Sequence, residues 1–271
     1  MKKYLSLLIS ICLSMHLSAQ ASHALVDAEK AFEKSCLDSG IRNGFLANVD
    51  SNGLQFTQNG PVDAKQFWRS LPAFEGIFSW SPSYSELSNF GDWGYTTGNY
   101  EHRSKTLKDP PDECGQYTTL WGKNEQGEWK YLMDIGNAHD CVPLDKNPTI
   151  ITLEKYGAGK QASQETLSEK EKEFIVSFDQ NIGEAYLKYG SSAYILNMPQ
   201  HHPVTSRDSA AMLLNRMSTL KYHPSGIKIS PGKDMAAAYG TFESDGKLGS
   251  YIRIWRHEKT GWKIALEVIR G

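Results

Sequence analysis

The sequence predicts an α+β fold that occurs twice along the chain, in two consecutive domains. The first observation behind this prediction is an internal repeat, because residues 80–101 align without a gap onto residues 222–243. The second is the order of the elements: each copy begins with segments of helical periodicity and ends with alternating segments typical of strands. Helices followed by an antiparallel meander are the pattern of an α+β domain.

The helices come first in each copy. In the first copy, apolar side chains recur every three or four residues over residues 24–37, and a shorter helix is predicted near residues 62–71. In the second copy, Ser168 and Glu171 have the spacing of a capping box ahead of an apolar helical stretch. A further short helix is predicted near residues 206–217.

The strands follow the helices. The last strand of each copy alternates apolar and polar residues, and a hairpin turn precedes it at residues 124–128 and again at residues 258–261. Because successive side chains of a strand point to opposite faces, the apolar residues should share one face. These residues are Trp129, Tyr131, Met133 and Ile135 in the first copy, and Trp262, Ile264, Leu266 and Val268 in the second.

A signature rich in glycine and aromatic residues marks the strands of the first copy. It reads GDWGYTTG at residues 91–98, Gly-x-Tyr-x-x-x-Trp at 115–121 and Gly-x-Trp-Lys at 127–130. This signature resembles the SnoaL-like domains, catalogued as domain of unknown function 4440, of the nuclear-transport-factor-2-like superfamily. The resemblance covers residues 24–138 and, as a diverged second copy, residues 168–270.

The resemblance implies two tandem cone-shaped domains with a cystatin-like fold. In each, a strongly curved antiparallel sheet would wrap around helices and leave a pocket. Proteins of this shape include ketosteroid isomerases, polyketide cyclases, dehydratases and plain binding proteins, so the shape alone does not assign a function. The domains are expected at residues 24–142 and 167–271, and the Pro-, Gly- and Lys-containing stretch at 143–166 is expected to be a linker.

The resemblance also implies how the two domains meet. Domains of this superfamily often pair through the outer faces of their sheets, so we expect an intramolecular pseudo-dimer of the two copies. Such pairing would bury the faces of Leu132 and Ala265. It would leave at the rim the acidic residues that recur in both copies, which are described below by residue number.

The N-terminus predicts a signal peptide over residues 1–19. Lys2 and Lys3 precede an apolar run at residues 4–17, and small residues follow it. The run is shorter than the ~20 residues of a membrane-spanning helix, so we expect an exported protein, periplasmic or secreted, without a membrane anchor. The formal net charge of the 271-residue chain is −2 and no basic block is present, which argues against a nucleic-acid partner.

Three cysteines follow the predicted signal peptide. They are Cys36, Cys114 and Cys141, an odd number, so at least one lacks a partner within the chain. An export compartment permits disulfides, and Cys114 with Cys141 is the candidate pair. The alternative is that all three are small buried apolar residues.

Three acidic positions recur in both copies, and the sequence predicts structural roles for them. Alternation along the last strand of the first copy places Asp134 opposite the apolar face. Asp92 lies in a turn, where aspartate commonly bonds the local backbone. We therefore expect them to face outward or to cap turns. The pairs are Asp92 with Asp234, Glu101 with Glu243, and Asp134 with Glu267.

Polar residues on the predicted inward face of the first copy are the candidates for a ligand pocket. Their equivalents in the second copy are mostly apolar, so any site is expected in the first. An imidazole titrates near neutral pH and a phenol can donate to a ligand oxygen, which makes His102 and Tyr100 the catalytic candidates. The alternatives are a solvent-exposed histidine and a tyrosine packed in the core. The pocket candidates are Thr96, Tyr100, His102, Thr118 and Tyr131.

No metal or cofactor site is predicted. The adjacent His201 and His202 would point in opposite directions on an extended chain, and the His139–Cys141 stretch is expected to be a loop. The favoured function is binding of a small apolar molecule or a scaffold role. The alternatives are an isomerase, cyclase or dehydratase that uses the first pocket, and an interaction module whose two cones are filled by their own side chains.

Overall fold

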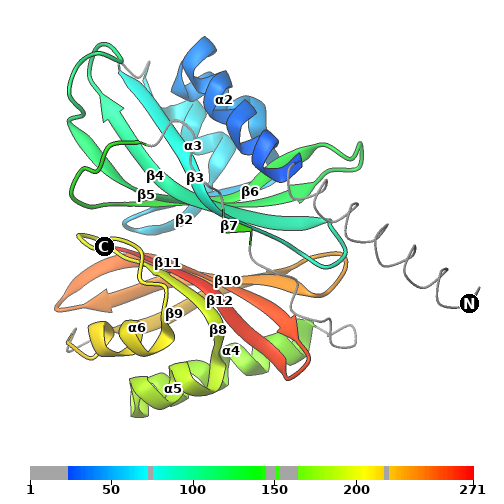
Figure 1. Ribbon diagram of the computed structural model, residues 1–271. Helices are drawn as coiled ribbons and strands as arrows, with labels where there is room; N and C mark the ends of the chain where they lie inside the picture. Colours follow the sequence, from blue (N-terminus) through cyan, green and yellow to red (C-terminus); the bar gives the residue numbers. More distant parts are fainter. Residues whose placement is uncertain (1–23, 73–75, 145–150, 153–163, 217–219) are drawn as a thin grey trace, which may run out of the picture.

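The computed structural model describes residues 24–72, 76–144, 151–152, 164–216 and 220–271. The predicted signal peptide lies outside the described residues. The chain forms two α+β units, each with its own sheet and its own helices, which confirms the predicted fold class. The two sheets lie face to face in the middle of the molecule, and the helices cover their outer sides (Figure 1).

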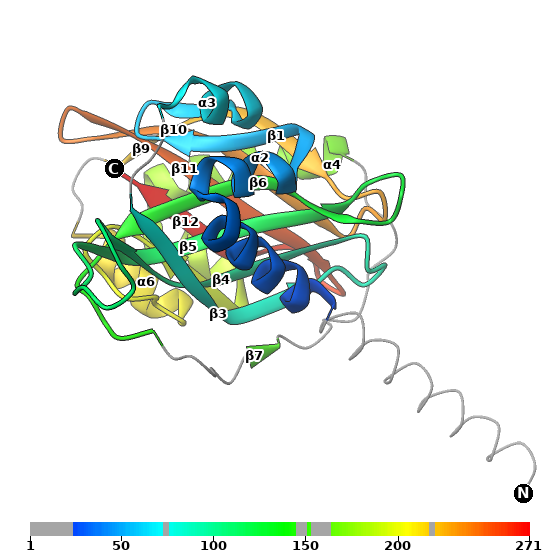
Figure 2. The same cartoon turned by 90° about the horizontal axis from the view of Figure 1, so that it is seen from above.

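The first unit places three helices on a seven-stranded sheet. A helix over residues 24–39 comes first, and Figure 2 shows it lying with α2 and α3 across the outer side of the sheet. The strand order is β2-β1-β6-β5-β4-β3-β7, and all neighbours are antiparallel except β1 with β6 and β3 with β7. The labelled elements are α2 (Ile41–Asn48), β1 (Val49–Thr57), β2 (Gly60–Asp63), α3 (Ala64–Ser70), β3 (Ile77–Leu87), β4 (Trp93–Arg103), β5 (Glu113–Lys123), β6 (Trp129–Ala138) and β7 (Ile151–Thr152).

The second unit repeats this plan with a five-stranded sheet of order β8-β12-β11-β10-β9. Here β8 and β12 are the parallel pair. Both sheets are therefore mixed, not purely antiparallel as expected, because the strand that follows the helices in each unit pairs with the last strand. The elements are α4 (Gln164–Gln180), α5 (Ile182–Tyr189), β8 (Gly190–Asn197), α6 (Arg207–Leu214), β9 (Lys221–Ile229), β10 (Met235–Ser244), β11 (Lys247–Glu258) and β12 (Gly261–Arg270).

The short predicted helices are present, and side chains cap them as their sequences suggest. Asp63 accepts a hydrogen bond from the backbone N–H of Gln66 at the start of α3, and Ser206 caps α6 in the same way. The predicted capping box is wrong. Helix α4 already begins at Gln164, so Ser168 lies within the helix and Glu171 is turned into the core.

The predicted linker is only partly a connector. Residues 151–152 within it form strand β7, which pairs with β3, and α4 begins before its expected end. Leu144, between β6 and β7, donates its backbone N–H to the carboxylate of Glu101 at 3.3 Å. The rest of the stretch lies outside the described residues.

Apolar side chains from both sheets form one shared core between them. It contains Met133 and Ile135 of β6 together with Leu266 and Val268 of β12. Leu132 is partly buried and packs against this core, and Ala265 is fully buried. Burial of this apolar layer is the main contribution that holds the units together.

Polar contacts fix how the sheets lie on each other. Asp92 accepts from the backbone N–H of Gly232 at 2.5 Å, and Asp234 accepts from the backbone N–H of Asn89 in return. Each aspartate also bonds a serine of its own turn, as expected for a capping residue. The repeated aspartates therefore cap their own turns and also join the two units.

A buried amide on β8, the edge strand of the second sheet, also joins the two units. Asn197 of β8 donates to the hydroxyls of Thr97 and Thr118, at 3.0 Å each. We expect Asn197→Ala to lower the free energy of unfolding by about 1–2 kcal/mol, because both hydroxyls lose a buried donor. Urea denaturation measures this change. Asn43→Ala on the exposed side of α2 is the control and should stay within about 0.5 kcal/mol. Equal stabilities of the two variants would contradict the expectation.

Candidate functional site

A β-bulge in the last strand of each unit reverses the faces that alternation predicts. In β6 the register shifts opposite Leu120 and Trp121, so that Tyr131 pairs with Trp121 but Met133 pairs with Leu120. The bulge adds one residue, Leu132, and every later side chain changes face. Asp134 therefore points toward the helices of its own unit, not outward or to the rim of the interface.

The second unit has the same bulge at the same place. Ile264 pairs with Trp255 but Leu266 pairs with Ile254, and Glu267 consequently turns inward. Glu267 is fully buried and Asp134 is 9% exposed, so the expectation of outward-facing acids is wrong for this pair. We call the space between the helices and the inner face of each sheet the first cone and the second cone.

Asp134 is held in the first cone by two hydrogen bonds. Its carboxylate accepts from the side-chain amide of Gln55 at 3.1 Å and from the hydroxyl of Thr119 at 2.9 Å. The amide of Gln55 is itself oriented by Trp68, whose indole N–H donates to it at 3.1 Å. Burial raises the pKa of Asp134, while these donors and the charge of Arg270 oppose the rise.

A second buried acid, Glu29, lies nearby on the helix over residues 24–39. It accepts from the indole N–H groups of Trp80 at 2.6 Å and Trp121 at 2.9 Å, and also from the hydroxyl of Thr96. Burial raises the pKa of Glu29 to about 7, and the negative charge of Asp134 adds to the rise. The first cone thus contains two carboxyl groups that repel each other.

A pattern in the sequence indicates that Glu29 is buried. Glu29 falls on the apolar stripe of its helix, four residues after Leu25 and three before Phe32. Glu171 occupies the same place between Leu167 and Phe174 in the second copy. A repeated acid on a repeated apolar stripe indicates a buried group.

The first cone keeps an open cavity of about 420 Å³. Aromatic rings of α2, α3, β3 and β4 line it, and Asp134, Glu113 and Arg270 provide its charged groups. Tyr117 also lines this wall, and its buried hydroxyl lies beside that of Thr96. Arg270 belongs to β12, so the second unit contributes to the wall of the first cavity.

Glu29 also lies on the wall of a second cavity, of about 610 Å³, which is lined by the helix over residues 24–39 and by β3 and β4. Leu144, the last residue described before 145–150, borders that cavity.

An arginine fills the centre of the second cone. Arg253 is fully buried and donates to Glu267 at 2.7 Å and also to Glu171. Its guanidinium carbon lies 4.2 Å from the ring centre of Phe174 and 4.5 Å from that of Tyr222. Three tyrosine hydroxyls complete the bonding of Glu267, from Tyr186, Tyr194 and Tyr222.

The predicted pocket residues do not form one group. Tyr100 does line the cavity and donates to Glu113 at 2.8 Å. Thr96 bonds Glu29 deeper in the cone, and Tyr131 packs on Phe32 in the core.

Two of the predicted pocket residues lie elsewhere. Thr118 pairs with Thr97 in the register of β5 on β4, so it faces the other unit and contradicts the prediction. His102 lies near the end of β4, 2.5 Å from the carboxylate of Asp112, and is not among the residues that line the cavity.

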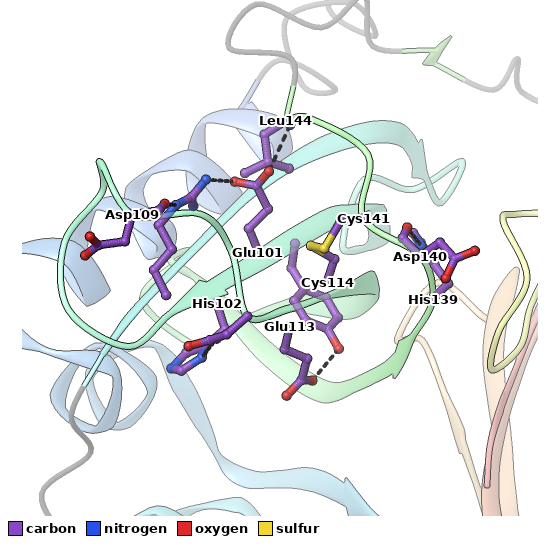
Figure 3. Close-up of a disulfide and its surroundings, with 12 residues drawn as sticks. Glu101, His102, Asp109, Glu113, Cys114, His139, Asp140, Cys141 and Leu144 are labelled. Atoms are coloured by element: carbon purple, nitrogen blue, oxygen red, sulfur yellow. Dashed lines mark hydrogen bonds and ion pairs between the residues drawn. A yellow bond between two sulfur atoms is a disulfide. The ribbon is translucent and has the colours of Figure 1, made fainter.

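Cys114 and Cys141 form a disulfide with their Cα atoms 5.0 Å apart, and Cys36 is free and buried. The bond ties the segment that follows β6 to β5, next to Glu101 and Leu144 (Figure 3). Glu101 is 5% exposed and forms an ion pair with Arg103 at 2.6 Å, so it is covered and not outward-facing. Its counterpart Glu243 is exposed, as expected.

The predicted loop histidines form no metal site. His139 packs against the ring of His202 at 4.6 Å, and its Nδ1 lies 2.8 Å from the backbone oxygen of Asp140. Within the described ranges, no three His, Cys, Asp or Glu side chains are placed to hold a metal ion. Among the helices of these ranges, none combines the length and apolar character needed to cross a bilayer.

No protein-family model and no curated protein matches the sequence. Solved structures show similarity to part of the chain. An "NTF2-like protein" from Cytophaga hutchinsonii is 17% identical over 41% of this chain and 98% of its own, with a TM-score of 0.35. A "ketosteroid isomerase-like protein" from Erwinia carotovora atroseptica is 17% identical over 39% and 93%, with a TM-score of 0.31. Nuclear transport factor 2 from Cryptosporidium parvum is 11% identical over 43% and 98%, with a TM-score of 0.35.

Proposed function

We propose that this protein binds a small, largely apolar molecule in the cavity of the first cone. The observation that carries the proposal is the contrast between the two cones. The second is filled by Arg253 and its bonded acids, whereas the first keeps an aromatic-lined cavity with Asp134 and Tyr117 in its wall. A concave apolar wall with a few convergent polar groups is the usual character of a small-molecule site.

The size of the cavity supports this proposal. Its volume of about 420 Å³ falls within the range of about 300–1,000 Å³ that is typical of ligand pockets. The rings of Phe45 and Trp68 stack in its wall, with their centres 4.0 Å apart, and give it a rigid apolar side. Arg270 and Glu113 would remain at its polar edge.

The second unit has a supporting role in this proposal. Its filled cone gives a rigid body that carries Arg270 to the wall of the first cavity. We propose that the two units act as an intramolecular pseudo-dimer with a single binding site. We also propose that the protein is exported, because a disulfide such as Cys114–Cys141 persists in oxidising compartments.

A cavity-filling substitution tests the binding proposal. Gly136 lines the cavity, and a Cβ atom added there would meet its neighbours only at 3.5 Å or more. We expect Gly136→Val to weaken binding of a retained or added apolar ligand at least tenfold, because the new side chain occupies ligand volume. Native mass spectrometry of the intact protein measures the bound fraction.

The control adds the same side chain at an exposed strand position of the second unit, Ser225→Val. This variant should bind like the unmodified protein. If neither the protein nor the control carries or takes up any small molecule, the cavity is not a binding site and the proposal fails.

A second candidate function is acid–base catalysis on the bound molecule. The observation in its favour is a buried carboxyl with a raised pKa, Asp134, in the wall of a cavity. Asp134 therefore replaces His102 as the residue to test. Turnover of the molecule identified by mass spectrometry, lost in Asp134→Asn and kept in His102→Gln, would support this second function.

A further inference from the structure

The second cone contains a cation that belongs to the chain itself. Arg253 lies between Glu171 and Glu267, and three aromatic ring centres lie 4.2 to 4.9 Å from its guanidinium carbon. We call this arrangement the arginine site. Its aromatic members are Phe174, Tyr222 and Tyr251.

The internal repeat gives every residue of the arginine site a counterpart in the first cone. The acids correspond to Glu29 and Asp134, and the three rings to Phe32, Trp80 and Tyr117. The strand register agrees with this correspondence. Arg253 pairs with Glu267, and the residue that pairs with Asp134 is Thr119. The first cone therefore keeps two acids and three rings but has threonine where the second has arginine.

The first cone differs from the second where the arginine is missing. Trp80, larger than its counterpart Tyr222, extends its indole N–H to Glu29. Two other counterparts of the arginine site, Asp134 and Tyr117, line the cavity. A ligand in the cavity therefore meets the carboxylate that corresponds to Glu267.

The charges around the cavity favour a cation. Asp134 and Glu113 line it, and the buried Glu29 lies close enough for the charge of Asp134 to act on it. Among the described residues, Arg270 is the one basic residue in the wall. Arg270 already donates to the backbone oxygen of Gly136. A cation between a buried carboxylate and aromatic faces gains both a charge-assisted hydrogen bond and cation–π attraction.

We propose that the ligand of the first cone carries a cationic amidinium, guanidinium or ammonium group that binds Asp134 as Arg253 binds Glu267. This inference rests on the proposed binding function and names the chemical class of the ligand. The apolar part of such a molecule would lie against the rings of Phe45 and Trp68, and its cationic end would meet Asp134.

Three probes of one shape test the inference by isothermal titration calorimetry on the full chain. They are benzamidine, which is cationic, benzamide, which is neutral, and benzoate, which is anionic. We expect benzamidine to bind at least tenfold more tightly than benzamide, and benzoate to bind most weakly. Asp134→Asn should remove the preference for benzamidine. Glu128→Gln, an equal charge change on an exposed hairpin, should keep it.

A second variant tests the arginine argument directly. Thr119→Arg places in the first cone the side chain that fills the second, and we expect a folded protein that no longer binds benzamidine. Equal binding of benzamidine and benzamide would overturn the cation inference and leave the binding proposal intact. Absence of binding by all three probes, in a protein that also retains no small molecule, would overturn both.

Discussion

Replacing Arg253 with methionine should be among the most destabilising single changes in this protein. The substitution keeps much of the side-chain volume but leaves Glu171 and Glu267 without their cation in a fully buried site. Removing one partner of a buried ion pair costs about 3–5 kcal/mol, because the remaining charge is neither solvated nor compensated. The free energy of unfolding, from urea denaturation near neutral pH, should fall by this amount.

A triple variant separates the loss of the cation from the loss of packing. Arg253→Met combined with Glu171→Gln and Glu267→Gln also removes the two buried carboxylate charges that would otherwise lack a partner. Neutral replacement of a whole buried ion group is often close to neutral for stability, so most of the loss should be recovered. If Arg253→Met alone were as stable as the unmodified chain, the guanidinium would have no role in holding the second cone.

The second large effect concerns the pH dependence set by Glu29. Burial raises its pKa from the ordinary 4.5 to about 7 in the folded protein. Between pH 4.5 and pH 7, Glu29 holds a proton in the folded state that it has released in the unfolded state. The contribution of Glu29 to the free energy of unfolding is therefore full below about pH 4.5 and falls as pH rises. At about 1.4 kcal/mol per unit, the change amounts to about 3 kcal/mol by neutral pH.

Glu29→Gln removes this titration, since glutamine resembles the protonated carboxyl. The stability of the variant relative to the unmodified chain should therefore grow by about 3 kcal/mol between pH 4.5 and pH 7. Denaturant unfolding of both proteins at a series of pH values measures the difference. Glu128 has an exposed carboxylate, so the free energy of unfolding of Glu128→Gln should change with pH as that of the unmodified chain does. Parallel profiles for Glu29→Gln would show that Glu29 is ionised throughout.

Much of the fold could be predicted from the sequence because local signals and the internal repeat agree. Asp63 and Ser206 stand where helices begin, and the apolar stripe over residues 24–37 matches an observed helix. No local sequence pattern indicates the parallel pairing of β1 with β6 or of β8 with β12. Pairing of strands far apart in sequence depends on how the whole chain closes.

The site was harder to predict because one extra residue in a strand changes the face of all that follow. No glycine in the sequence indicates the bulge at Leu132 or its repeat at Ala265. The two bulges turn Asp134 and Glu267 inward. The same sensitivity to register misplaced Thr118, which pairs with Thr97 and not with Thr96. Strand alternation predicts faces only up to the first irregularity.

Covalent fusion of the two copies has a consequence for how this protein can change over generations. In an assembly of two identical chains, any substitution appears in both halves, so an arginine that fills one cone would fill the other. Here Arg253 and Thr119 occupy equivalent positions in a single chain and can differ. One half can thus specialise in rigidity while the other keeps its cavity. Because Arg270 of the rigid half borders that cavity, neither half can drift independently of its neighbour.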